Sequence, residues 1–235
     1  MSRPETKQDM SASECVLREA KGNRKWLEYS SEEEVKLVHR VFLTEHSELP
    51  RVVVFSGVGH GDGSTTVCVR AARVIADQVK GSVCVVDANL RSPALHHHFG
   101  TTNKTGFMTA LKRPDRLGQC VIQCDPQLWF LPSGAKDTSI DPTTVTVDRV
   151  AAIVRHLRDR FDRVLFDTPP SGIYADAARL GEFADGMVLV VRANRTRREA
   201  ARRAKEDLEA VNVRILGAVL NARTFPIPSF IYRRL

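Results

Sequence analysis

Hydrophobic residues gather in six short runs that are rich in β-branched side chains, a pattern typical of strands. In chain order the runs are RVVVF from Arg51, SVCVVD from Ser82, LWFLP from Leu128, RVLFD from Arg163, GMVLVV from Gly186 and ILGAVLN from Ile215. Segments with helical periodicity at 65–79, 147–161 and 197–211 lie between most of them. Because the runs are apolar throughout, we predict an α/β fold: a doubly wound, mostly parallel sheet with helices on both faces.

The chain ahead of the first strand divides at about residue 30. Residues 1–30 are polar and mixed in charge, and we expect a flexible N-terminal tail there. From Ser31 the sequence SSEEEVKLVHRVFL predicts a helix, because the serine can cap it and the glutamates favour the positive end of the helix dipole. Its apolar residues, Val35, Val38, Val41 and Phe42, share one face. We therefore expect a single domain over residues 31–235.

Composition narrows the class of protein. The 235 residues are 43% hydrophobic, and no apolar stretch approaches the roughly 18 residues that span a bilayer. The N-terminus lacks the apolar segment of a secretory signal and the five cysteines are scattered, so we expect a cytoplasmic protein. The net charge of +7 permits acidic partners. The arginines at 192–205 could bind phosphate or anionic lipid, but carboxylates intersperse them, which favours a solvated helix there.

The loop after the first strand has the character of a phosphate-binding loop. Gly61 and Gly63 let backbone N–H groups face a phosphate, and the helix that follows adds its N-terminal dipole. The hydroxyl of Thr65 is placed to bind Mg²⁺. The predicted nucleotide-binding segment comprises Gly61, Asp62, Gly63, Ser64, Thr65 and Thr66. A tight turn is the competing interpretation of the loop taken alone.

Aspartates end two of the apolar runs. Asp87 follows SVCVV and Asp167 follows RVLF, and open α/β sheets bind their ligands at these strand ends. Mg²⁺ prefers hard oxygen ligands, so we predict that Asp87, Asp167 and Thr65 together bind this ion. A lone aspartate at a strand end is more often a helix cap. The combination of two such aspartates with the glycine loop favours a nucleotide site.

Several long motifs in order resemble the P-loop ATPases of the MinD/ParA-like group, and more narrowly the bacterial tyrosine kinases of capsule and exopolysaccharide biosynthesis. SVCVVDANLRSPALHHHFG resembles their second acidic motif with Leu-Arg-x-Pro, and FDRVLFDTPP resembles their Walker B strand. The segment LWFLPSGAKDTSIDP and the region 184–221 also match the family. The resemblance implies ATP or ADP with Mg²⁺ as ligands, Asp87 and Asp167 as catalytic residues, and contact of Asn221, with Arg223 nearby, to the adenine.

The loop departs from the family pattern in its charge. The family has lysine where this chain has Ser64, and the extra lysine of the MinD-like subgroup is replaced by Gly59. One charge-assisted contact contributes about 1.5–3 kcal/mol to binding, and more where charge develops during the reaction. Asn89 also stands where the acidic motif usually has a second aspartate. These changes predict weak ATP binding and little kinase activity.

Two further departures concern assembly. The family's kinases end in a tyrosine-rich tail, whereas Tyr232 is the one tyrosine near this C-terminus. The family's helix with Glu, Arg and Arg at three-residue spacing, through which its rings assemble, has Glu33, Lys36 and His39 here. The sign pattern is kept on one helix face, so we predict a homo-oligomer contact, with a solvated face as the alternative.

Three functions remain open at this stage. The first is a degenerate regulatory member of the kinase family, and the second is an active ATP-dependent tyrosine kinase or ATPase of the same pathway. The third, a DNA-partitioning ATPase, is disfavoured by the Leu-Arg-x-Pro and Asp-Thr-Pro-Pro motifs. The resemblance implies a polysaccharide co-polymerase, or chain-length-determinant membrane protein, as partner. We therefore expect the protein at the inner face of the plasma membrane, and we do not expect it to bind nucleic acid.

Overall fold

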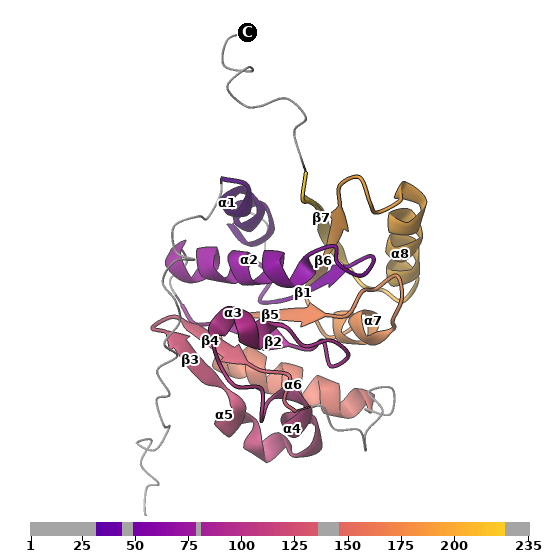
Figure 1. Cartoon of the computed structure of the whole chain (residues 1–235). Coiled ribbons are helices and arrows are strands. Elements are labelled where there is room, and N and C mark those ends of the chain that lie inside the picture. The colour runs from indigo at the N-terminus through magenta and orange to yellow at the C-terminus, as the bar shows by residue number, and fades with distance from the viewer. Residues whose placement is uncertain (1–31, 44–48, 79–80, 136–145, 224–235) are drawn as a thin grey trace, which may run out of the picture.

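A seven-stranded sheet forms the centre of the molecule (Figure 1). The computed structural model describes residues 32–43, 49–78, 81–135 and 146–223. The strand order is β3-β4-β2-β5-β1-β6-β7, and every neighbouring pair is parallel except β3 and β4. The predicted α/β fold with a mostly parallel sheet is confirmed.

All six apolar runs form strands. They are β1 (Val52–Gly57), β2 (Val83–Asp87), β4 (Leu128–Leu131), β5 (Arg163–Thr168), β6 (Gly186–Arg192) and β7 (Ile215–Asn221). The remaining strand, β3 (Ile122–Asp125), was not predicted. It pairs antiparallel with β4 at the edge of the sheet, and its side chains alternate between half-buried and exposed. A strand with a single buried face alternates apolar and polar residues, so its sequence contains no continuous apolar run.

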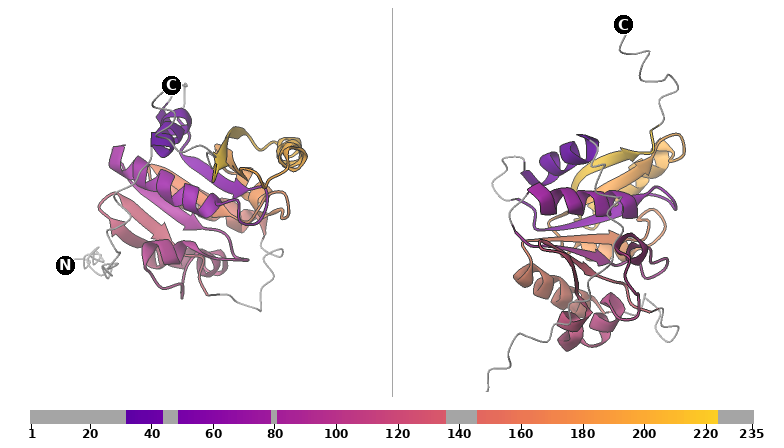
Figure 2. Two further views of the ribbon diagram at one scale, coloured as in Figure 1. Left: turned by 45° about the horizontal axis from the view of Figure 1, so that its top comes forward. Right: turned by 60° about the vertical axis from the view of Figure 1, so that its left-hand side comes forward.

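Helices cover both faces of the sheet, as Figure 2 shows. On one face lie α1 (Glu32–Val38), the π-helical turn η2 (His39–Leu43), α2 (Ser64–Gln78) and α3 (Leu95–Phe99). The other face is covered by α4 (Phe107–Lys112), the 3₁₀ turn η3 (Pro114–Arg116), α5 (Leu117–Cys120), α6 (Val147–Arg160), α7 (Asp176–Gly181) and α8 (Arg198–Ala210). This arrangement is the doubly wound layering that the sequence predicts.

The first helix packs through the predicted apolar face. Val38 and Phe42 are fully buried, and Val35 and Val41 pack against the same cluster. The sequence predicts one continuous helix, but the α-helix ends at Val38 and continues as the π-helical turn η2. The expected cap at Ser31, the tail at 1–30 and Tyr232 lie outside the described residues.

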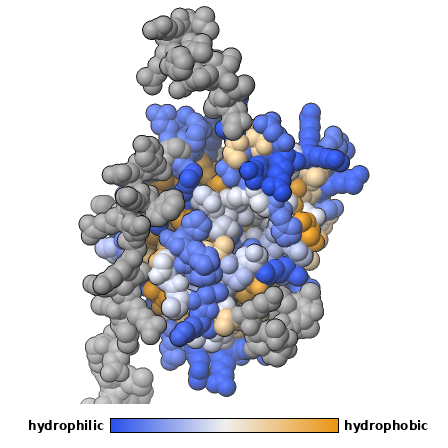
Figure 3. Space-filling view, viewed as in Figure 1, coloured by the Kyte–Doolittle hydropathy of each residue, from blue (hydrophilic) through white to orange (hydrophobic). Residues whose placement is uncertain are grey.

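The surface seen in Figure 3 is mainly hydrophilic, with small scattered apolar areas. Within the described ranges, no helix combines the length and the apolar character that a bilayer crossing needs.

On α8, Lys205 and Glu209 pair at 2.6 Å and Arg202 and Glu206 at 3.5 Å, so two of its basic side chains are neutralised locally.

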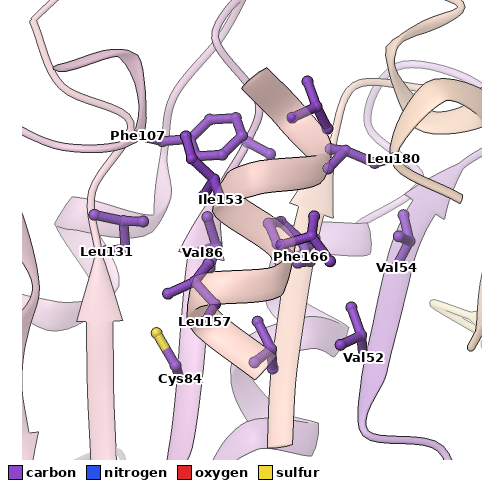
Figure 4. Packing of buried hydrophobic residues seen from close by; sticks show 14 of the residues in the cluster. Val52, Val54, Cys84, Val86, Phe107, Leu131, Ile153, Leu157, Phe166 and Leu180 are labelled. Carbon is purple, nitrogen blue, oxygen red and sulfur yellow. The ribbon is translucent and has the colours of Figure 1, made fainter. Parts of the chain in front are cut away.

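Alternate residues of the central strands pack into the two layers. Val52, Val54 and Phe166 face α6 and α7, together with Ile153 and Leu157 from α6 (Figure 4). The intervening residues, among them Val53, Phe55 and Leu165, face α2. Because both faces are dry, β1 and β5 are fixed in register, and their carboxyl ends stop at the same edge of the sheet.

A close backbone approach near this edge gives a test of the packing. The N–H of Phe107 donates to the carbonyl of Pro132 at 2.7 Å, which brings the start of α4 against the end of β4. A methyl group on Gly106 would overlap that carbonyl oxygen. We expect Gly106→Ala to lower the free energy of unfolding by about 1–3 kcal/mol, because the backbone must move apart. Urea unfolding measures the change.

Gly217→Ala is the matched control. Its methyl group on β7 would have no heavy atom within 4 Å, so we expect a change within about 0.5 kcal/mol. Equal stability of the two variants would mean that the approach of α4 to β4 is not a constraint on the fold.

Candidate nucleotide-binding site

The glycine loop runs from the end of β1 into the first turn of α2, which begins at Ser64. Gly61 has φ +76° and Gly63 has φ +89°, values in the left-handed region that favours glycine. In the described part of the chain, the backbone N–H groups of residues 61–64 donate to no protein acceptor. Four open donors at the start of a 15-residue helix are suited to binding an anion.

Asp62 braces the loop from inside. Its side chain is buried, and its carboxylate accepts the N–H of Gly59 at 2.8 Å and the hydroxyl of Thr196 at 3.0 Å. The backbone carbonyl of Asp62 accepts the side-chain amide of Asn221 at 2.8 Å. Asp62 and Asn221, two of the residues predicted to contact the nucleotide, therefore also fix the loop, Asp62 to the turn after β6 and Asn221 to the end of β7. Their contact with a nucleotide stays a prediction.

Thr65 and Asp167 meet directly. The Thr65 hydroxyl donates to Oδ2 of Asp167 at 2.6 Å. The other oxygen, Oδ1, is buried and accepts no hydrogen bond from any described residue. An unpartnered carboxylate oxygen in a dry interior is costly unless a proton or a cation compensates it. This oxygen is therefore the natural position for a ligand that the protein alone does not supply.

Asp87 lies beside Asp167, because the two are register partners on β2 and β5. Its Oδ2 accepts the backbone N–H groups of Ala94 and Leu95 at 3.2 and 3.1 Å, and its Oδ1 accepts that of Asn89 at 3.2 Å. The helix-capping role that competes with metal binding in the sequence is therefore real. A carboxylate has further lone pairs, so the cap does not exclude a shared cation.

Burial dominates the acidity of this pair. It raises the pKa of Asp167 to about 8, although the Thr65 hydroxyl opposes it; the charge of Asp87 adds to the rise and the Ser64 hydroxyl lowers it. Burial also raises the pKa of Asp87 to about 7, against the three backbone hydrogen bonds. Two carboxyl groups that resist ionisation side by side are stabilised as anions by a divalent cation.

The residues present fit a magnesium-bound phosphate. The Thr65 hydroxyl and the two carboxylates are oxygen donors of the kind Mg²⁺ prefers, and one carboxylate oxygen is uncommitted. Bound Mg²⁺ would neutralise charge on the phosphate and carboxylate oxygens, while the loop N–H groups would orient the phosphates. The described residues contain no cluster of three His, Cys, Asp or Glu side chains suited to a metal, so two carboxylates and one hydroxyl are what this site offers to the ion.

The other predicted residues lie at varied distances from this centre. Ser64 and Thr66 are half-buried in the first turn of α2, and Arg223 is exposed just beyond β7. Arg70 cannot replace the missing lysine, because its guanidinium pairs with Glu34 at 2.8 Å. The side chain of Asn89 stays within the segment that follows β2, where its Oδ1 accepts the N–H of Ser92 at 3.0 Å.

The predicted assembly residues share one exposed surface. Glu33 and Lys36 on α1 form an ion pair at 3.0 Å, and His39 follows at the start of η2. All three residues are exposed. Their role in assembly stays a prediction.

Two arginines that the sequence assigns to a solvated helix lie beside the loop. Nη1 of Arg192 donates to the carbonyl of Gly61 at 3.1 Å, and Arg195 lies next to the same glycine. The sequence predicts a solvated helix over 192–205, but α8 begins only at Arg198. Arg192 is the last residue of β6, so the rule that parallel strands present their ligands at their carboxyl ends was the signal that was available.

Known proteins resemble this chain closely. Residues 51–212 match the family model described as Cellulose biosynthesis protein BcsQ. Tyrosine-protein kinase YwqD of Bacillus subtilis (strain 168) is 32% identical over 173 residues, which is 73% of this chain and 72% of the relative. The kinase domain of Escherichia coli tyrosine kinase ETK has a TM-score of 0.67 and 25% identity over 76% of this chain and 71% of that one. The chimerical protein CapA2B2 has a TM-score of 0.78 at 23% identity, over 86% of this chain and 89% of that one, a likeness of fold.

The sheet order and the structural likeness show that the chain has the fold of the ParA family ATPases. The chain belongs to the family that the BcsQ model describes, and its identity with YwqD places it with the bacterial tyrosine-protein kinases. The resemblance that the sequence motifs carry is thus confirmed. Ser64 remains the position at which this chain lacks the lysine of the family's loop.

The buried pair predicts an unusual pH dependence. In the absence of Mg²⁺, folding raises the pKa of Asp167 and Asp87 from 3.8 to about 8 and about 7, so the folded state binds more protons across this window. The free energy of unfolding should therefore fall as pH rises from about 4 to about 8 and then level off. Asp167→Asn should make this fall smaller, because one titrating group and its charge on Asp87 are lost. Urea unfolding in EDTA at about pH 5 and about pH 8 measures it.

Asp162→Asn is the control, because hydrogen bonds from the backbone and hydroxyl of Ser82 lower the pKa of Asp162. Its carboxylate contributes stability that is complete above pH 3.8 and is lost only at lower pH. Asp162→Asn should therefore be less stable than the wild type, but its free energy of unfolding should fall between about pH 5 and about pH 8 as much as that of the wild type. If Asp167→Asn keeps the wild-type dependence, the carboxyl pair does not titrate in this window.

Proposed function

We propose that this protein is a regulatory member of the bacterial tyrosine kinase family in exopolysaccharide or capsule biosynthesis. It binds ATP with Mg²⁺ more weakly than family members whose loop has the lysine, and it catalyses little phosphorylation on its own. The observation that carries this proposal is Ser64, a neutral residue at the lysine position of a loop that otherwise keeps its open backbone donors and its contact between Thr65 and Asp167.

The loss of the lysine affects catalysis more than binding. Backbone N–H groups and the dipole of α2 still attract phosphate, and the carboxylates still favour Mg²⁺. Phosphoryl transfer, in contrast, depends almost wholly on positioning and on stabilising the charge that develops on the transferred group. A serine hydroxyl offers a dipole there in place of a full charge. We therefore propose that nucleotide occupancy, rather than turnover, is the output of this domain.

Family membership supports the choice of partner. We propose that the domain contacts a polysaccharide co-polymerase, a chain-length-determinant membrane protein, and is thereby located at the inner face of the plasma membrane. Asn221 and Arg223, at the end of β7, are proposed to contact the adenine of the bound nucleotide. Asp87 and Asp167 are proposed to bind the Mg²⁺ and to serve catalysis through it.

Ser64→Lys tests the proposal. A lysine in the first turn of α2 adds one charge-assisted contact to the phosphates, so the affinity for ATP should rise by about 1.5–3 kcal/mol, roughly tenfold to a hundredfold. Isothermal titration of wild type and variant with ATP and Mg²⁺ measures this, and a kinase assay on the same samples measures turnover.

Gln78→Lys, at an exposed position at the far end of α2 from the loop, is the control for added charge and should leave the affinity unchanged. Robust phosphorylation by the wild type would contradict the regulatory reading and favour an active kinase. A lysine variant that gains no affinity would mean that the loop no longer binds phosphate.

We also propose that the face of α1 and η2 with Glu33, Lys36 and His39 contacts a second copy of the chain. The exposed ion pair of Glu33 with Lys36 supports this, because opposite charges three residues apart on one helix face are available for exchange with the same charges of a partner.

Glu33→Lys should weaken this association, since it places like charges together at the contact. We expect at least a severalfold rise in the dissociation constant by sedimentation equilibrium, with circular dichroism to confirm folding. Glu206→Lys on α8 makes the same charge change at another exposed ion pair and should have no effect. A wild type that sediments as a monomer at every concentration would refute the contact.

A further inference from the structure

We propose that Arg192 and Arg195 supply the bound triphosphate with the positive charge that Ser64 does not. This inference rests on the proposed function, because it requires that the glycine loop binds ATP with Mg²⁺. In this chain the two arginines take over the electrostatic role that lysine has in the family's loop.

The turn after β6 is fixed against the glycine loop. The N–H of Ala193 donates to the carbonyl of Asn221 at 2.9 Å, and the N–H of Arg192 donates to the hydroxyl of Thr196 at 2.8 Å. That hydroxyl in turn donates to the buried carboxylate of Asp62 inside the loop. A continuous chain of hydrogen bonds therefore positions the backbone of both arginines relative to the phosphate-binding donors.

Both guanidinium groups converge on Gly61. Arg192 contacts the carbonyl of Gly61 with Nη1, at 3.1 Å. A methyl carbon placed on Gly61 would lie 3.3 Å from Nη1 of Arg195 and 3.9 Å from Nη1 of Arg192. The loop thus has two cationic groups beside the glycine that begins its run of open N–H donors.

Neither arginine is neutralised. Across the described residues, no carboxylate lies within 4.0 Å of either guanidinium, whereas Arg70 pairs with Glu34 and Arg91 pairs with Asp176. A guanidinium has five N–H donors, and Arg192 gives one of them to Gly61 while Arg195 gives none to a described residue. Uncommitted guanidinium donors suit phosphate oxygens, which they bind in bidentate geometry.

The charge around the loop requires such a group. The carboxylates of Asp62, Asp87 and Asp167 are all buried near the phosphate-binding donors, and a triphosphate adds further negative charge. One Mg²⁺ does not balance this sum. Arg192 and Arg195 contact or flank the loop and have no acidic partner among the described residues.

The double variant Arg192→Gln and Arg195→Gln removes both charges and keeps side chains of similar length and polarity. We expect the dissociation constant for ATP with Mg²⁺ to rise about tenfold or more by isothermal titration. Arg192→Lys with Arg195→Lys retains the charge and should lose less. Arg203→Ala, an exposed arginine on α8, is the control and should bind as the wild type does. Circular dichroism and thermal unfolding establish that each variant is folded.

A cycle with Ser64→Lys separates charge from bracing. If the arginines act for the lysine, then Ser64→Lys should improve ATP binding by a larger factor in the double glutamine background than in the wild type. The same factor in both backgrounds, or wild-type affinity in the double variant, would overturn the inference while leaving the proposed function intact. A wild type that binds no ATP at millimolar concentration would overturn both.

Discussion

Two carboxylates buried side by side are the constraint on which the site depends. The register of β2 with β5 makes Asp87 and Asp167 direct neighbours, and both are excluded from water. Ionising such a pair without compensation is expensive. Three backbone N–H groups that donate to Asp87, and the Thr65 hydroxyl that donates to Asp167, offset part of this cost. Among the described residues Oδ1 of Asp167 has no hydrogen-bond donor, so this oxygen is available to a cation.

Hydrogen bonds to neighbouring elements hold the glycine loop in place. Asp62 is acidic, so its presence inside a phosphate-binding loop weakens the attraction for anions. Its carboxylate, however, ties the loop to Thr196, and its carbonyl ties it to Asn221. The loop therefore keeps its shape through contacts with the turn after β6 and the end of β7, independently of any lysine. Loss of the lysine removes charge from the site without removing the geometry that presents the N–H donors.

Much of the fold could be predicted because its central strands, such as β1, β2 and β5, are buried on both faces. Runs such as RVVVF and RVLFD have no polar interruption, and all six runs became strands. β3 escaped prediction because only one face of Ile122–Asp125 is buried, so half of its residues are polar. The π-helical turn after Val38 also left no mark in the sequence, since its apolar residues still fall on the packed face.

The centre of the site was predictable for the same reason, as Asp87 and Asp167 end apolar runs. Its second layer was not. The contact of Asp62 with Thr196 spans 134 residues of chain and that of Arg192 with Gly61 spans 131 residues, and such contacts depend on how the strands are ordered in space. Arginine-rich sequence at 192–205 resembles a solvated helix, and only the start of α8 at Arg198 separates the two loop-side arginines from the helical ones.

The pairing of β1 with β5 bears on how the protein is synthesised. Val52 pairs with Val164, so the central strands of the sheet are separated by 164 − 52 = 112 positions. Loop closure over such a distance is slow compared with local contacts, and on a ribosome the second strand emerges long after the first. β1 and the glycine loop must therefore wait without their neighbours while the middle of the chain is translated. The phosphate-binding loop is among the first parts of the site to be made and among the last to acquire its final shape.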